Sequence, residues 1–208
     1  VWYESLVRIR NTSGEYEPPV KYLQIAKSTG MDTVIAQFML ETACAALERS
    51  DKDISINITL QDMQNERFLE LVEKALAKRV KGSGALIFEI LERDDLADAQ
   101  SCLKFINRVR ELGCKVAIDD FGTGHSNFFN VLNLPVDIVK IDGFLVKKMT
   151  ESSHARSMIE GIASLFSKMG IPLVAEYVEN EEIFSALNLL NINYMQGYHF
   201  GMPGENYF

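Results

Sequence analysis

The chain carries the sequence KVAIDDFGTG at residues 115–124. Lys115–Ile118 is a short, mostly apolar run, which predicts a buried β-strand. Asp119 and Asp120 follow this strand directly, and the glycines at 122 and 124 predict a loop over residues 119–124. A buried strand that brings acids to its carboxyl end is typical of a parallel sheet with a functional site at that edge.

The same alternation of apolar strand and amphipathic helix extends along the whole chain. We expect strands at 1–9, 54–58, 85–90, 115–118, 137–141, 173–176 and 194–198, and helices at 20–28, 32–49, 66–79, 95–112, 153–169 and 181–190. Nearly continuous apolar strands are buried on both faces, which indicates a parallel sheet covered by helices.

This pattern predicts an α/β fold, a TIM-like (β/α)8 barrel that lacks its N-terminal strand, in one domain over residues 1–208. Seven strands fall one short of eight, so we expect the sequence to be a piece of a larger chain. An open doubly wound sheet is the alternative, but its nucleotide-binding signature is absent after the first strand.

Polar residues stand at or beside the ends of most predicted strands: Glu4, Asn57, Glu89, Asp119, Asp120, Lys140, Asp142, Glu176 and Gln196. Each has a simpler explanation by itself, as a helix N-cap, a turn residue or a surface lysine. On one rim, however, the six acids would repel one another unless cations were bound. Carboxylate and amide oxygens suit Mg²⁺ or Mn²⁺ better than zinc, and two such ions serve displacement at phosphorus.

The composition restricts the classes of partner. Lys and Arg number 21 against 29 Asp and Glu, which gives a formal net charge of −8. An acidic chain without a basic run is not expected to bind long nucleic acid, although a cation could bridge it to a small phosphate ligand. Sequence patterning shows no membrane segment and no signal peptide. With three cysteines in no metal-ligand spacing, we expect a cytoplasmic protein, or the cytoplasmic part of a larger one.

The ordered set of motifs resembles the EAL-domain family of cyclic di-GMP phosphodiesterases. The matching segments are Glu4-Ser5-Leu6-Val7-Arg8 for E-A-L-x-R, Ser55-Ile56-Asn57-Ile58, Phe88-Glu89-Ile90-Leu91-Glu92 for E-I-x-E, Asp119-Asp120-Phe121-Gly122-Thr123-Gly124, Lys140-Ile141-Asp142, Ala175-Glu176-Tyr177-Val178-Glu179 and Gln196-Gly197-Tyr198. The resemblance runs from residue 1 to about residue 203, and D-D-F-G-T-G and K-I-D are its most specific motifs.

The resemblance implies roles for the matching residues. The ligands of a first Mg²⁺ or Mn²⁺ ion would be Glu4, Asn57, Glu89 and Asp119, and those of a second would be Asp119 and Asp120. Lys140 would orient the attacking water or a phosphate oxygen, and Glu176 would be the general base or hold the water. Glu92 would anchor the loop at 119–124 and couple the site to a dimer surface. The residues that would position the ligand or complete the acidic shell are Arg8, Asp142, Glu179 and Gln196.

The activity that the resemblance implies is hydrolysis of cyclic di-GMP to linear pGpG, in a homodimer with a possible upstream sensory or cyclase-like domain. A catalytically silent cyclic di-GMP receptor is the alternative, and a metal-dependent barrel enzyme acting on a sugar phosphate is a third hypothesis. The acids and the D-D-F-G-T-G loop are intact, which favours the enzyme.

The chain departs from the family pattern at three positions. Ser5 replaces the usual Ala, Tyr177 stands where Gly is commonest, and His125 replaces a common Tyr. We expect Tyr177 to alter access beside Glu176, and the glycines at 122 and 124 to permit a mobile loop over the site.

Overall fold

The computed structural model describes residues 2–17, 19–77, 84–92, 99–122 and 133–205. The chain forms two compact units, the first comprising Val1–Glu89 with Ala99–Cys114, and the second Ile90–Asp98 with Lys115–Phe208. The organisation of residues 1–208 as a single domain stays a prediction.

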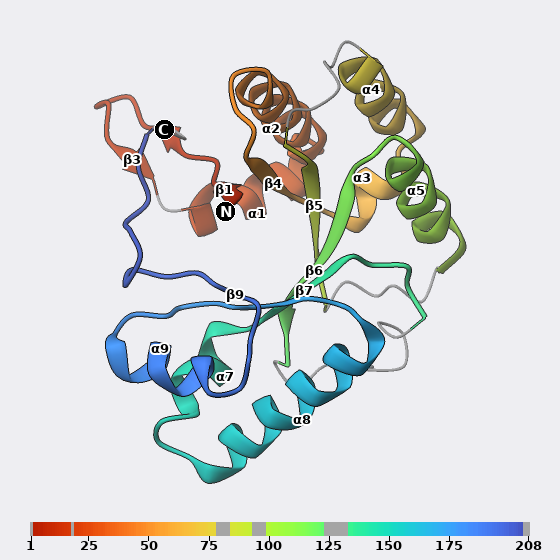
Figure 1. The fold of residues 1–208 in the computed structure, drawn as a ribbon. Helices are drawn as coiled ribbons and strands as arrows, with labels where there is room; N and C mark the ends of the chain where they lie inside the picture. Colours follow the sequence, from red (N-terminus) through yellow and green to blue (C-terminus); the bar gives the residue numbers. More distant parts are fainter. Residues whose placement is uncertain (1, 18, 78–83, 93–98, 123–132, 206–208) are drawn as a thin grey trace. The chain divides into compact units, whose positions relative to one another are not determined.

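The first unit contains β1 (Trp2–Ser5), β4 (Asp53–Ile58) and most of β5 (Leu86–Leu91), in the sheet order β1-β4-β5. The last two residues of β5, Ile90 and Leu91, belong to the second unit. Strand β1 pairs in parallel with β4, and Glu4 lies opposite Ser55. The helices are α1 (Pro19–Thr29), α2 (Asp32–Leu47), α3 (Leu60–Gln64), α4 (Glu66–Ala77) and α5 (Ala99–Glu111). Helix α2 packs on β4, and α4 lies beside α2 and α5 (Figure 1).

Aromatic packing fixes α4 and α5 in this unit. The rings of Phe68 and Phe105 are stacked with centroids 6.3 Å apart, and Phe88 meets Phe105 edge-on at 5.5 Å. All three side chains are buried, so helices and strand share one apolar core.

The second unit contains four parallel strands in the order β6-β7-β8-β9: β6 (Lys115–Phe121), β7 (Ile138–Ile141), β8 (Leu173–Ala175) and β9 (Tyr194–Met195). Its helices are α7 (Gly143–Lys148), α8 (Ser153–Met169) and α9 (Glu181–Asn188), and α7 packs against α8 (Figure 1). Because the strands are parallel, their carboxyl ends lie at one edge of this part of the sheet.

Helix α8 shows why the sequence specifies these boundaries. The Ser152 side chain accepts a hydrogen bond from the Ala155 amide, and Gly170 ends the helix in the left-handed conformation at φ 70°. Asn180 caps α9 in the same way by accepting from the Ile183 amide. None of the helices in the described ranges has the length and apolarity needed to cross a membrane.

The structure corrects the predicted first strand. Strand β1 ends at Ser5, and a small antiparallel hairpin follows, formed by β2 (Ile9–Arg10) and β3 (Tyr16–Glu17). The hairpin turn is held by the Asn11 side chain, which accepts hydrogen bonds from the Ser13 and Glu15 amides. The apolar run at 1–9 therefore continues past the point where the sheet pairing stops.

Other boundaries differ as well. The strand predicted at 115–118 continues to Phe121, so Asp119 and Asp120 belong to β6 and not to a loop. The last strand is only Tyr194–Met195, and the short helices α3 and α7 were not expected. Both short helices have an N-cap side chain, Thr59 with Asp62 in α3 and Asp142 in α7.

The core of the second unit gives a stability prediction. Phe166 is buried and meets Phe121 edge-on at 5.2 Å, so Phe166→Ala removes contacts that the surroundings cannot replace. We expect a loss of about 3–5 kcal/mol in the free energy of unfolding, measured by chemical denaturation. Phe38→Ala is the matched control, because Phe38 is exposed and its truncation should cost below about 1 kcal/mol. Equal losses in the two variants would contradict the assigned core.

Candidate functional site

A β-bulge brings two adjacent aspartates to the same place. Ile118 pairs with Val139 and Phe121 with Ile141, so Asp119 and Asp120 together oppose the single residue between these partners on β7. Asp120 has φ 56°, a left-handed conformation that Asp tolerates better than most residues. Successive residues of a regular strand point to opposite faces, and the bulge interrupts this alternation.

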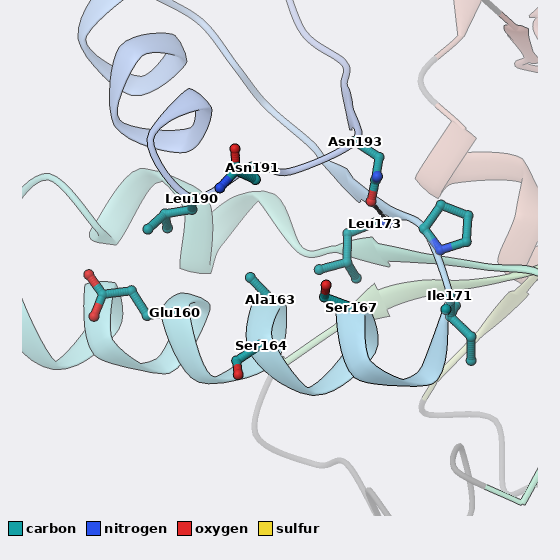
Figure 2. A pocket seen from close by; sticks show the side chains of 11 residues that line it. Glu160, Ala163, Ser164, Ser167, Ile171, Leu173, Leu190, Asn191 and Asn193 are labelled. Carbon is teal, nitrogen blue, oxygen red and sulfur yellow. Dashed lines mark hydrogen bonds between the residues drawn. The ribbon is translucent and has the colours of Figure 1, made fainter.

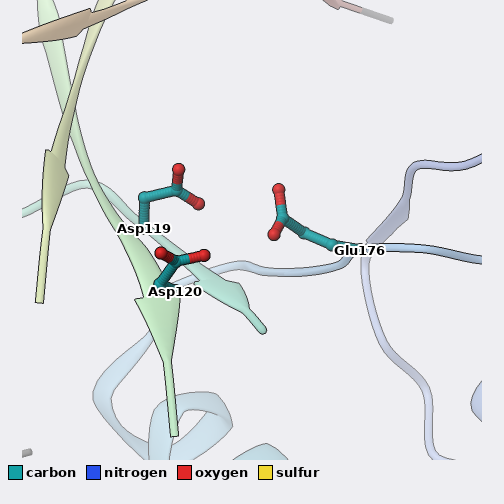
Figure 3. Close-up of side chains that lie close together, drawn as sticks. All are labelled: Asp119, Asp120 and Glu176. Carbon is teal, nitrogen blue, oxygen red and sulfur yellow. The ribbon is translucent and has the colours of Figure 1, made fainter. Parts of the chain in front are cut away.

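Glu176 completes an acidic cluster with these two residues. It follows β8 directly, and its amide donates to the Ile141 carbonyl at 3.2 Å, which ties it to the end of β7. Carboxylate oxygens of Asp119, Asp120 and Glu176 all lie within 4.8 Å of one another (Figure 3). We call these three residues the acidic cluster.

A buried lysine lies between the acids. The side chain of Lys140, on β7, is fully buried, and its Nζ is 2.8 Å from Glu176 Oε1 and 3.1 Å from Asp119 Oδ1. The two carboxylates are themselves largely shielded, with side chains 12% and 11% exposed. A buried ammonium requires such partners, because desolvation of an isolated charge is very costly.

The charges of this cluster do not cancel. The acidic cluster has three carboxylates and the Lys140 ammonium contacts two of them, so the ionised groups leave an excess of negative charge. All donor atoms of the acidic cluster are carboxylate oxygens, the ligands preferred by hard cations such as Mg²⁺ and Mn²⁺. The residues therefore fit a divalent cation.

Four further predicted residues lie in the second unit. Glu92 accepts a hydrogen bond from the Gly122 amide at 2.9 Å, a contact suited to anchoring the segment after β6. Asp142 caps α7 by accepting from the Phe144 amide, and Glu179 forms a half-exposed ion pair with Lys147 at 3.0 Å. Gln196 is half-buried, and its backbone bonds to Ala175 and Val178. The roles assigned to these four residues stay predictions.

The other predicted ligands lie in the first unit. Asn57 follows Ile56 on β4, and its side-chain amide donates to Glu4 Oε1 at 3.1 Å, so these two are neighbours. Glu89 is fully buried on β5, and Arg8 is exposed, with its guanidinium bonded to the Val7 carbonyl. Their assignment as metal or ligand contacts stays a prediction.

The structure describes two of the three residues that depart from the family pattern, Tyr177 and Ser5. Tyr177 has φ 54°, a conformation that favours glycine, which explains physically why the position accommodates Gly so readily. Ser5 is buried at the end of β1. His125 lies outside the described residues, and so do Thr123, Gly124 and the mobile loop predicted around them.

The bulge is the feature of the site that sequence reasoning missed. The tandem Asp119-Asp120 was expected to begin a loop, and instead it sits inside a strand with its register shifted by one residue. The available signal for the bulge in the sequence was the pair of adjacent acids that directly continue an apolar strand. The correct prediction was that acids from separate strands meet, as Asp119 and Glu176 do.

The second unit also holds a hollow of about 460 Å³ that is unrelated to the acidic cluster (Figure 2). It lies between α8 and the segment 190–193, at the end of β8 where Leu173 donates its amide to the Asn193 side chain. Glu176 follows the opposite end of this strand. Of the lining residues only Glu160 is charged, so the hollow lacks the donor set of a metal site.

Parallel strands that bring acids to their carboxyl ends define an α/β protein, an arrangement that TIM-like barrels share with open parallel sheets. The family model of the EAL domain matches residues 1–203, and the chain belongs to this family. A crystal structure of the FimX EAL domain from Pseudomonas aeruginosa bound to c-di-GMP superposes with a TM-score of 0.90 at 23% identity, covering 98% of this chain and 84% of that one. This likeness confirms the predicted fold class.

Two further similarities concern named phosphodiesterases. The cyclic di-GMP phosphodiesterase PdeF of Escherichia coli (strain K12) is 32% identical over 208 residues, which is 98% of this chain and 28% of that protein. A structure described as the PaMucR phosphodiesterase in complex with c-di-GMP has a TM-score of 0.85 at 27% identity, covering 96% of this chain and 83% of that one. The chain spans about a quarter of the length of the first curated relatives that it matches.

The buried ion pairs give a second stability prediction. Lys140→Met keeps most of the side-chain volume but leaves the shielded carboxylates of Asp119 and Glu176 without their ammonium. We expect a loss of about 3–5 kcal/mol in the free energy of unfolding at neutral pH.

Lys148→Met is the matched control for this variant. Lys148 lies 2.6 Å from Glu151 and lowers the pKa of that carboxyl through a hydrogen bond, but both side chains are exposed. Its loss should lower the free energy of unfolding far less than Lys140→Met does, because solvent screens an exposed pair. Urea denaturation of both variants measures the difference, and a Lys140→Met protein as stable as the control would show that the ion pairs contribute nothing.

Proposed function

We propose that this domain is a metal-dependent phosphodiesterase that hydrolyses cyclic di-GMP to linear pGpG. The observation that carries the proposal is the acidic cluster of Asp119, Asp120 and Glu176 around the buried Lys140. The named activities of PdeF and PaMucR support the same reaction and substrate.

The residues of the cluster have separable tasks in this reaction. Contact with the Lys140 ammonium favours the ionised form of Glu176, which is the form that accepts a proton from an attacking water. Lys140 also holds Asp119 and Glu176 at a fixed separation, since its Nζ contacts both. Attack of the water oxygen on phosphorus breaks one P–O3′ bond, and the departing oxygen takes up a proton to give pGpG.

Asp119 and Asp120 would hold divalent cations in this proposal. Their carboxylates, with Glu176, form an oxygen-only donor set that suits Mg²⁺ or Mn²⁺. Such ions supply Lewis-acid stabilisation of the negative charge that develops on the phosphate. The family pattern assigns Asp119 to both ions and adds Glu4, Asn57 and Glu89 as ligands of the first, and that assignment remains a prediction.

Product formation tests the proposed activity. Incubation with cyclic di-GMP and Mg²⁺ or Mn²⁺ should yield pGpG, separated by reversed-phase chromatography, and chelation with EDTA should stop it. Glu176→Gln should lower kcat by at least about 100-fold, because the variant keeps the shape but loses the proton acceptor. Glu160→Gln, on the exposed face of α8, is the control and should retain activity.

Three outcomes are informative in this assay. Formation of pGpG by the parent protein supports the proposal. Tight binding of cyclic di-GMP without turnover identifies the catalytically silent receptor and overturns it. Failure to bind the nucleotide excludes both functions.

Metal binding can be tested without substrate. Addition of Mg²⁺ or Mn²⁺ to the metal-free protein should raise its melting temperature, since an ion that binds only the folded state at 100 times its Kd adds about 2.7 kcal/mol. For a chain of this size the shift would be about 5–10 °C.

Asp120→Asn should reduce this metal-induced shift, because it removes one negative charge and one ligand from the acidic cluster. Glu160→Gln should leave the shift unchanged, since Glu160 lies on α8 in an exposed pair with Arg156. Differential scanning calorimetry with and without the ion provides the measurement. An ion-independent melting temperature in the parent protein would argue against a resident cation.

A further inference from the structure

Tyr177 occupies a conformation that an aromatic residue rarely adopts. Its φ is 54°, in the left-handed region, where a residue with a side chain is strained relative to the usual conformations. The residue is also 56% exposed, so burial of its ring in the core does not compensate for this strain. The residue immediately before it is Glu176, whose carboxylate belongs to the acidic cluster.

The ring of Tyr177 rests on Gly143, the first residue of α7. A Cβ atom added at Gly143 would overlap the ring, at 2.5 Å from Tyr177 Cγ and 2.8 Å from Tyr177 Cβ. Cβ atoms essentially never lie within 3.0 Å of another heavy atom in this way, so a side chain at position 143 would force a shift. Tyr177 Cβ is bonded to the backbone, so rotation of the ring cannot relieve the overlap with this atom and the chain at residue 177 would have to move. Because Gly143 has no side chain, it leaves the space that the ring occupies. We call this contact surface on Gly143 the seat of the ring.

A cation also contacts the ring. Lys147 Nζ lies 4.9 Å from the ring centroid and 3.0 Å from Glu179 Oε1. Cation–π contacts are attractive at exposed sites as well, so this contact offsets part of the backbone strain. Ring, lysine and carboxylate connect α7 with the segment that follows β8.

Two contacts therefore join the same pair of strand ends. One is the buried ion pair between Lys140 at the end of β7 and Glu176 after β8. The other is the contact between Tyr177 and Gly143. Tyr177 directly follows Glu176, and Gly143 is three residues after Lys140. The Glu176 amide also donates to the Ile141 carbonyl, so the backbone is held at Glu176 by this hydrogen bond and at the next residue by the contact of Tyr177.

We propose that Tyr177 is a positioning residue, which by seating its ring on Gly143 holds the Glu176 carboxylate at Lys140 and the acidic cluster. The inference rests on the proposed phosphodiesterase function and concerns the placement of its general base. Tyr177 acts through Glu176 and is not itself a catalytic residue. Displacement of a reacting group by about 1 Å can lower a rate by up to about 100-fold, so loss of the seat should affect kcat.

A double-mutant cycle at positions 143 and 177 tests this inference. Gly143→Ala should displace the ring and lower kcat by about tenfold, with KM changed by less than about twofold. Tyr177→Gly removes the ring and frees the backbone, and should lower kcat by a similar factor. In the Tyr177→Gly background the added methyl group meets no ring, so Gly143→Ala should have little further effect. Tyr177→Phe keeps the ring and should retain kcat within about twofold.

The readouts separate positioning from a general loss of structure. Melting temperature and circular dichroism identify a variant that is unfolded at the assay temperature, while kcat and KM of the folded variants report the placement of Glu176. Rescue by Tyr177→Phe and non-additivity in the cycle support the inference. An active parent protein whose kcat is unchanged by Gly143→Ala, or lowered equally in both backgrounds, overturns the inference and leaves the proposed function standing. A parent protein that makes no pGpG overturns the proposed function and the inference with it.

Discussion

The ammonium group of Lys140 is the charge around which the second unit is organised. Its side chain is fully buried on β7, and the neighbouring strands β6 and β8 lead to its partners Asp119 and Glu176. Transfer of an uncompensated ammonium into a protein interior costs several kcal/mol, so the partners must be present wherever the lysine is. If β6 or β8 shifted by one residue relative to β7, the side chains of that strand would exchange faces and the carboxylate beside Lys140 would be lost. The ion pairs thus stabilise one register of the sheet, and this register is the one that gathers the acidic cluster.

The bulge in β6 adds the third acid, which regular strand geometry would exclude. Asp119 and Asp120 are adjacent in sequence, and in a regular strand their carboxylates would leave on opposite faces. With two residues opposite Lys140 and φ 56° at Asp120, both approach Glu176. Among the described residues, left-handed non-glycine conformations occur at Asp120, Tyr177 and Asn191. Asp120 belongs to the acidic cluster, and Tyr177 directly follows Glu176 of that cluster. Two of the three strained residues therefore lie at the site, as expected where backbone strain serves function.

Most of the α/β architecture followed from the sequence, because apolar periodicity and capping residues are local signals. Ser152 and Gly170 delimit α8 in sequence as they do in the structure. The meeting of Asp119 and Glu176 could also be predicted, since parallel strands deliver their ends to one edge. The bulge could not, because it depends on how β6 pairs with β7 rather than on residues 119 and 120 alone. The seat of Tyr177 on Gly143 escaped prediction for the same reason, since 34 positions separate a glycine from the ring that requires it.

An acidic cluster of this kind contributes little to the stability of a fold, which is an argument that it has a function. Apolar residues of similar volume commonly stabilise a protein as well as a buried ion pair does, or better. Here three carboxylates lie together and two of them contact the one ammonium, so repulsion among the acids adds to their desolvation. A divalent cation reverses the sign of that interaction and converts a repulsive cluster into a ligand set. The strained turn at Tyr177 adds a further cost beside Glu176. Because the remaining core of the unit is apolar and well packed around Phe121 and Phe166, it can support this local instability.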